Sequence, residues 1–173
     1  MKCKICNTSA QYAFNGKILN KYNVKYYKCS FCGYLFTEEP FWLSEVYTDA
    51  ISKFDTGIVA RNISLSKKVS IFLTLKNINT NLYVDYSGGY GLFTRLMRDK
   101  GFNFFWVDKY AKNIFSEGFE YISNDFNNIG MVTAFECFEH FTDPIKVFDK
   151  ILSECSVLIF STVLMPSSVP ESG

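Results

Sequence analysis

Residues 81–109 constrain the fold of this chain more than any other part of the sequence. Residues 82–84 are a short apolar run of strand-forming residues, and the small residues of the segment 87–91 then form a turn. Apolar residues recur at helical spacing over residues 92–97, and residues 102–107 form a second apolar run. This order of strand, glycine loop, helix and strand predicts the βαβ unit of an open α/β sheet.

Each of the two predicted strands ends on a carboxylate, Asp85 after the first and Asp108 after the second. Ligands of such sheets bind beyond the carboxyl ends of the strands. A dinucleotide site would need a third glycine or alanine after Gly89 and Gly91, and Asp85 would repel its pyrophosphate. The two carboxylates instead suit a cationic ligand with ribose hydroxyls, such as S-adenosylmethionine. The alternative is an α/β domain with a tight glycine turn and no cofactor.

This segment resembles motifs I and II of the class I S-adenosylmethionine-dependent methyltransferases, in which an acidic residue and G-x-G open the cofactor site. Residues 131–144, MVTAFECFEHFTDP, are similar to the segment after strand 4 of many small-molecule methyltransferases, including the ubiquinone-biosynthesis O-methyltransferases. Ser87 stands where the motif usually has its first glycine, so we expect slightly different backbone angles there. The resemblance implies a cofactor site made of Asp85, Ser87, Gly89, Gly91, Asp108, Asp125 and Glu136, with Asp125 near the adenine.

Four of the six cysteines form two C-x-x-C pairs, Cys3 with Cys6 and Cys29 with Cys32. This spacing is typical of a structural zinc site with four thiolates. An Asn-Gly pair at residues 15–16 predicts a hairpin turn between the two cysteine pairs, so the module reads as a zinc ribbon. Two disulfides or a redox pair are the alternatives, and both fit a cytosolic hairpin poorly. Cys137 and Cys155 are expected to be buried apolar residues.

We expect three parts: a zinc ribbon (1–36), a helical connector (37–79) and a Rossmann-like methyltransferase domain (80–173). The connector should hold a short helix starting at residues 38–40 and a longer one capped by residues 55–56. The longer helix is expected to bury Ile58, Val59, Ile63, Val69, Phe72 and Leu73. We favour a solvent-facing position for its Arg61, with contact to the cofactor carboxylate or the substrate as the alternative.

After Asp108, strands are expected at residues 120–122, 131–135 and 157–161, with a helix from Pro144 that turns Val147, Phe148 and Leu152 inward. A class I methyltransferase sheet normally has seven strands, and few residues follow the last predicted one. We therefore expect either a C-terminal truncation or a partner chain that covers the exposed edge of the strand at 157–161.

Glu136, Glu139 and His140 follow the strand at residues 131–135 at spacings that bring them together. His140 is the one histidine and is a candidate general base, with Glu139 as a second catalytic candidate. The three side chains could also hold a divalent metal. We favour a hydrogen-bonded cluster that shapes the floor of the pocket.

The charge distribution bears on the partners. Residues 1–36 carry six lysines and no acid, while the rest of the chain carries twelve bases and seventeen acids, a net charge of −5. The basic ribbon favours an anionic partner, but an acidic body does not look like an RNA-binding surface. No apolar run approaches the roughly 20 residues of a membrane helix, and there is no signal-like segment, so we expect a cytoplasmic protein without a membrane partner.

We therefore expect a methyltransferase that uses S-adenosylmethionine and a structural zinc ion to modify a small metabolite, sugar-linked or phosphorylated. One alternative is a zinc-ribbon methyltransferase of rRNA or tRNA. The other is a truncated paralogue that binds the cofactor or a partner without turnover.

Overall fold

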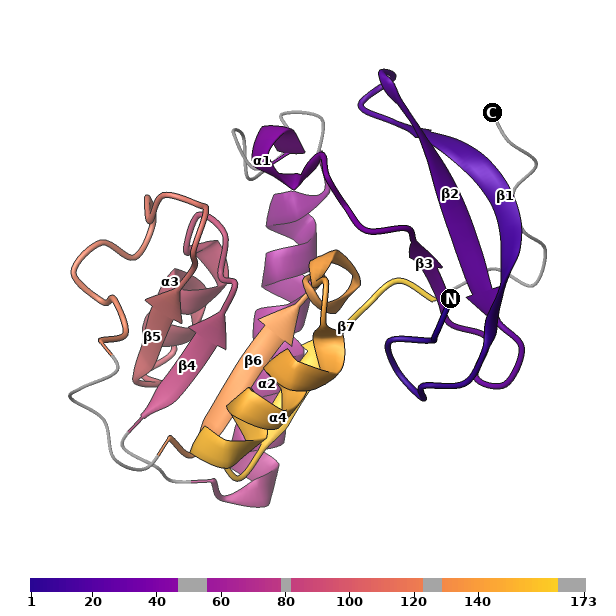
Figure 1. Cartoon of the computed structure of the whole chain (residues 1–173). Helices are drawn as coiled ribbons and strands as arrows, with labels where there is room; N and C mark the ends of the chain where they lie inside the picture. Colours follow the sequence, from indigo (N-terminus) through magenta and orange to yellow (C-terminus); the bar gives the residue numbers. More distant parts are fainter. Residues whose placement is uncertain (47–55, 79–81, 123–128, 165–173) are drawn as a thin grey trace.

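The computed structural model describes residues 1–46, 56–78, 82–122 and 129–164. Asp55 and Asp125, expected to cap a helix and to contact the adenine, lie outside these residues. The described chain forms two sheets, a three-stranded antiparallel sheet at the N-terminus and a four-stranded parallel sheet (Figure 1). No helix in the described ranges combines the length and the apolar character needed to cross a membrane.

The N-terminal sheet consists of β1 (Ala10–Ile18), β2 (Tyr22–Cys29) and β3 (Leu35–Thr37) in that spatial order. The predicted turn at Asn15-Gly16 is wrong, because both residues lie inside β1 and pair with Lys25 and Val24. The chain turns instead between Ile18 and Tyr22, where Leu19 and Asn20 take positive φ angles. Gly16 serves packing: a Cβ atom there would lie 2.7 Å from the ring of Tyr26.

The connector forms a short helix α1 (Leu43–Val46) and a long helix α2 (Ile58–Lys76). The N-cap of α2 is Gly57 and provides no side-chain hydrogen bond, so Thr56 is not the cap. The prediction that α2 buries Val69 and Leu73 is confirmed, but Val59 and Ile63 are 54% and 40% exposed. The α2 sequence has apolar residues on both sides of the helix, so its periodicity could not identify the buried face.

The parallel sheet has the strand order β5-β4-β6-β7, with β4 (Tyr83–Tyr86), β5 (Phe104–Val107), β6 (Met131–Phe135) and β7 (Leu158–Ser161). Helix α3 (Leu92–Arg98) joins β4 to β5, and α4 (Pro144–Glu154) joins β6 to β7. The predicted βαβ unit and Rossmann-like fold class are confirmed. The strand expected at 120–122 is reduced to one bridge between Glu120 and Trp106.

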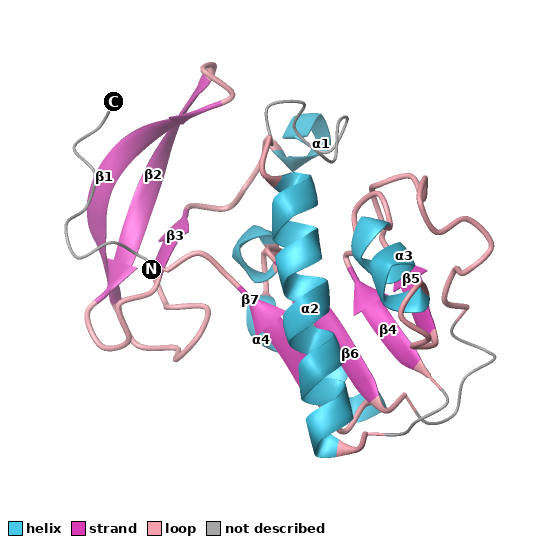
Figure 2. Cartoon of the chain, turned by 180° about the vertical axis from the view of Figure 1, so that it is seen from behind, coloured by secondary structure: helices cyan, strands magenta, loops and turns pink. Residues whose placement is uncertain are grey.

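Helices cover both faces of this sheet, with α2 and α3 on one face and α4 on the other (Figures 1 and 2). Two clusters of buried side chains fill the layers, one including Leu73, Phe93 and Met97 and the other including Val84, Ala134 and Ile151. Asp143 caps α4 by accepting a hydrogen bond from the Lys146 amide, as its position before Pro144 predicts. Leu152, expected to point inward, is 42% exposed.

Candidate cofactor cavity and metal site

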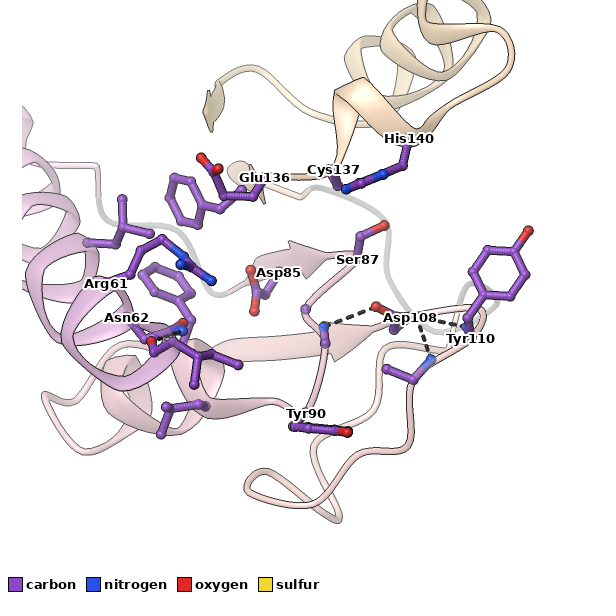
Figure 3. A pocket seen from close by; sticks show the side chains of 18 of the residues that line it. Arg61, Asn62, Asp85, Ser87, Tyr90, Asp108, Tyr110, Glu136, Cys137 and His140 are labelled. Carbon is purple, nitrogen blue, oxygen red and sulfur yellow. Dashed lines mark hydrogen bonds between the residues drawn. The ribbon is translucent and has the colours of Figure 1, made fainter. Parts of the chain in front are cut away.

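A cavity of about 570 Å³ lies at the carboxyl ends of β4, β5 and β6, beside the first turns of α2 (Figure 3). This is the edge where ligands of open parallel sheets bind, and the volume falls in the range of small-molecule sites. Predicted site residues that line it are Asp85, Ser87, Gly89, Asp108, Glu136, Glu139 and His140.

Asp85 is the most deeply placed charged group of the cavity, with 2% of its surface exposed. Its two carboxylate oxygens accept hydrogen bonds from the hydroxyl groups of Thr94 (3.0 Å) and Thr133 (2.9 Å). Burial raises the pKa of Asp85 from 3.8 to about 7, against the opposing effect of the two hydroxyls, and Asp108 adds a smaller increase. Burial therefore disfavours the charged form of Asp85, and a cation bound beside it would favour that form again.

The glycine loop lies closely over the second strand. A Cβ atom on Gly88 would lie 2.6 Å from Trp106, and one on Gly91 would lie 2.4 Å from the Ser116 hydroxyl. The indole of Trp106 donates a hydrogen bond to the carbonyl of Gly89 (2.9 Å). The loop is thus held against β5 in a form that side chains at these glycine positions would prevent.

Ser87 adopts φ = +55°, in the left-handed region that favours glycine. Serine therefore occupies a glycine conformation at this position, and its side chain lies at the cavity near Cys137 (Figure 3).

Asp108 fixes the loops on both sides of it. One carboxylate oxygen accepts from the amide of Gly89 (3.0 Å), and the other accepts from the amides of Tyr110 and Ala111 (2.8 Å each) (Figure 3). A carboxylate oxygen has two acceptor sites, so the oxygen bonded to Gly89 can accept a further hydrogen bond from a ligand hydroxyl.

Glu136, Glu139 and His140 follow β6, the last two in a 3₁₀ turn, η1 (Phe138–His140). The hydroxyl of Ser161 donates to the Glu136 carboxylate (2.6 Å), and that of Thr162 donates to Glu139 (3.0 Å). These bonds support the interpretation of a hydrogen-bonded cluster. Among the described residues, the group of side chains that could hold a metal is the cysteine set, so a second metal at 136, 139 and 140 has no support.

Sequence reasoning missed part of the cavity wall. Arg61 lines the cavity and its guanidinium points inward, so the favoured solvent-facing position is wrong (Figure 3). Tyr90, Tyr110 and Phe141 also line it. Arg61 is three residues from Ile58 and four from Leu65, which also line the cavity. This helical spacing could have predicted that Arg61 lies on the same face of α2.

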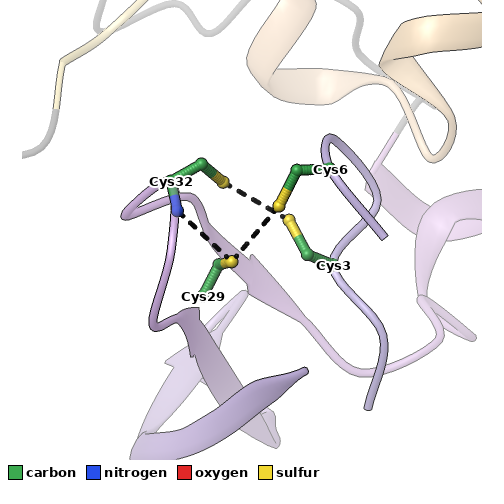
Figure 4. Close-up of side chains that lie close together, drawn as sticks. All are labelled: Cys3, Cys6, Cys29 and Cys32. Atoms are coloured by element: carbon green, nitrogen blue, oxygen red, sulfur yellow. Dashed lines mark hydrogen bonds between the residues drawn. The ribbon is translucent and has the colours of Figure 1, made fainter. Parts of the chain in front are cut away.

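The four N-terminal cysteines converge at the end of the ribbon (Figure 4). Their sulfur atoms all lie within 4.8 Å of one another, with 3.5 Å between Cys3 and Cys32 and between Cys6 and Cys29. Zinc–sulfur bonds of about 2.3 Å in a tetrahedron place sulfur atoms roughly 3.8 Å apart. Backbone amides of Ile5 and Cys32 point at the sulfurs of Cys3 and Cys29. The set fits one tetrahedral zinc ion.

Comparison with known proteins agrees with this geometry. A family model described as a methyltransferase domain matches residues 60–173, which include most of α2, the glycine loop and the whole parallel sheet. No curated protein matches the sequence.

Proposed function

Because this chain belongs to the methyltransferase domain family, we propose that it transfers a methyl group from S-adenosylmethionine to a small acceptor that carries a sugar or phosphate group. The cofactor would supply the electrophilic methyl group. The chain's own residues would hold the cofactor and the acceptor in line for transfer, which is where most of the rate gain of such a reaction arises.

One observation carries the proposal: two carboxylates at neighbouring strand ends face one cavity across a glycine loop. Asp85, buried under the loop, would bind the cofactor ammonium, and Asp108 would accept from the ribose hydroxyls. Arg61, on the opposite wall, would meet the cofactor carboxylate or an anionic acceptor. Opposite charges thus line the cavity in an order that suits a zwitterionic ligand.

Calorimetry with S-adenosylhomocysteine tests this assignment. Asp108→Ala should weaken binding about 10- to 150-fold, because a lost charged hydrogen-bond acceptor costs about 1.5–3 kcal/mol. Asp149→Ala, which removes an exposed carboxylate on α4, is the matched control and should bind as the wild type does. Binding of NAD in place of S-adenosylhomocysteine would contradict the proposal.

We assign the acceptor side of the cavity to Glu139 and His140. Where the acceptor must lose a proton, His140 would take it as general base, and Glu139, bonded to Thr162, would orient it. His140→Asn should then lower kcat while leaving the affinity for S-adenosylhomocysteine unchanged. A loss of both in parallel would show that His140 only supports the cavity.

The cysteine set would hold a structural zinc ion, since four thiolates leave no open coordination position. Elemental analysis of protein purified without added metal should find one zinc per chain. Cys29→Ser should lose it, whereas Cys155→Ser, outside the cluster, should keep it. Disulfides found by mass spectrometry would overturn the assignment.

In this proposal the basic ribbon would bind the anionic part of the acceptor.

An RNA methyltransferase is the second candidate, and one observation favours it. Four aromatic rings follow one another across the ribbon with centroid distances of 6.4, 6.1 and 5.6 Å: Tyr12, Tyr27, Phe36 and Tyr34. Lys25 is two residues from Tyr27 on β2 and thus on the same face. Rings and lysines together can stack bases and bind phosphates.

Filter binding with total bacterial RNA at two salt concentrations distinguishes the two acceptors. The small-acceptor proposal predicts weak binding, because the chain outside the ribbon carries a net charge of −5 and would repel RNA phosphates. Sub-micromolar binding that falls steeply with salt would favour RNA. A chain that binds S-adenosylhomocysteine but turns over neither class of acceptor would be the non-catalytic alternative.

A further inference from the structure

Helix α2 carries large apolar side chains on the side that faces away from the sheet. Val59, Ile63, Ile71 and Leu75 are 54%, 40%, 59% and 79% exposed. With Lys67 they follow one another at intervals of four residues, which is the spacing of a ridge along a helix. The helix has 19 residues, so the ridge extends over roughly 25 Å.

The same side of the molecule is basic. Residues 58–76 and 92–100, which hold α2 and α3, carry seven bases and one acid. Arg61 points into the cavity, Arg98 packs on the ring of Phe119 and Arg95 pairs with Asp99, which leaves four lysines. Lys67, Lys68, Lys76 and Lys100 are exposed. Lys100 reaches across from the end of α3 to the Ser66 hydroxyl of α2 (3.1 Å), so this charge lies beside the ridge.

The shape and charge of this face limit what can cover it. Figure 2 shows α2 in front of the parallel sheet, with no other described helix or strand lying over its outer side. A partner helix is usually bound in a groove between elements. A second copy of the chain packed through the same face would bring two sets of these exposed lysines together. An extended anionic surface into which apolar side chains can insert fits both the apolar ridge and the lysines.

We propose that the outer face of α2 docks the protein on the surface of an anionic lipid bilayer. Ile63, Ile71 and Leu75 would enter the headgroup region, while the lysines bind lipid phosphates and keep their charged ends at the surface. The sequence-based expectation of no membrane partner rested on the absence of a long apolar run. That absence argues against a membrane-spanning helix and not against docking at the membrane surface. The proposal is independent of the reaction, because α2 presents this face away from the sheet.

Vesicle co-sedimentation of the zinc-loaded chain tests the proposal. We expect binding to vesicles of equal parts phosphatidylglycerol and phosphatidylcholine, weakening with salt, and little binding to phosphatidylcholine alone. Ile71→Ser/Leu75→Ser and Lys67→Glu/Lys68→Glu should each bind at least tenfold more weakly. These side chains are exposed, so both variants should fold, as judged by circular dichroism and zinc content.

Helix α4, on the opposite face, provides matched controls. Ile145→Ser/Leu152→Ser and Lys146→Glu/Lys150→Glu make the same changes at exposed positions and should bind within twofold of the wild type. The proposal fails if the wild-type chain does not bind anionic vesicles at low salt, or if the α2 variants bind as well as the α4 variants. It also fails if light scattering finds a dimer that Ile71→Ser/Leu75→Ser dissociates, since α2 would then be a self-interface.

Discussion

We expect the buried carboxyl group of Asp85 to lower the stability of the fold above about pH 7. Its pKa rises from 3.8 to about 7, and each pKa unit corresponds to about 1.4 kcal/mol. A carboxyl group whose pKa is raised in the folded state contributes to the free energy of unfolding. This contribution is fully present below pH 3.8 and is lost as the pH rises through 7. Ionised Asp85 therefore lowers the free energy of unfolding by about 4 kcal/mol above pH 7.

Asp85→Asn should remove this cost. The amide oxygen can accept from one threonine hydroxyl, and the amide nitrogen can donate to the other, because a hydroxyl also accepts. We expect the variant to be more stable than the wild type by about 2–4 kcal/mol at pH 8, below the full value because one hydroxyl must reorient. Between pH 8 and pH 5 this advantage should shrink by about 2–3 kcal/mol, as the wild-type carboxyl takes up its proton.

Urea unfolding of the zinc-loaded chain at both pH values measures the effect. Comparing variant with wild type at each pH cancels the pH dependence of the cysteine site. Asp149→Asn, at an exposed carboxylate, should change stability little at either pH. An Asp85→Asn variant that is less stable than wild type at pH 8, or that shows the same advantage at both pH values, would refute the reasoning. The same variant should bind S-adenosylhomocysteine more weakly, so stability and binding should change in opposite directions.

Three other outcomes are expected. Gly91→Ala should destabilise the chain by about 2–4 kcal/mol in urea unfolding, because backbone strain at φ = +83° adds to a contact of 2.4 Å between the new Cβ and Ser116. The control Gly101→Ala, at φ = +87° with open space around it, should cost only about 1–2 kcal/mol. Trp106→Phe should cost about 1 kcal/mol through the lost bond to Gly89 and should weaken S-adenosylhomocysteine binding. Chelation of zinc should abolish hydrogen-exchange protection in β1 and β2 while β4 and β6 keep theirs, because the ribbon is too small to fold without metal; equal loss in both sheets would contradict this.

The sequence was most informative where local pattern and chemistry agree. The βαβ unit around the glycine loop is confirmed because strand, turn and helix signals follow one another within 29 residues. The convergence of the four cysteines is confirmed because their spacing permits few other arrangements. Both features depend on residues that are close in sequence or on a ligand set with one preferred geometry.

Long-range packing decided the features that the sequence did not predict. The N-terminal hairpin turns after Ile18 and not at Asn15-Gly16, because pairing with β2 places Gly16 opposite Val24 and under the Tyr26 ring. The depth of Asp85 was equally hidden, since Thr133 lies 48 residues away from it. Inward orientation of Arg61 depends on which face of α2 meets the sheet, and a helix with apolar residues all round does not reveal that face.

Backbone strain links two of the predicted site residues. Ser87 follows β4 with φ = +55°, and Glu136 follows the neighbouring strand β6 with φ = +51°. A residue other than glycine pays about 1–2 kcal/mol for this conformation, and strain of this kind gathers at functional sites. Glycine would adopt both conformations without this cost. The presence of serine and glutamate therefore indicates that their side chains are needed at these positions. The Glu136 carboxylate accepts a hydrogen bond from Ser161 at the end of β7, and Ser87 and Glu136 both line the cavity.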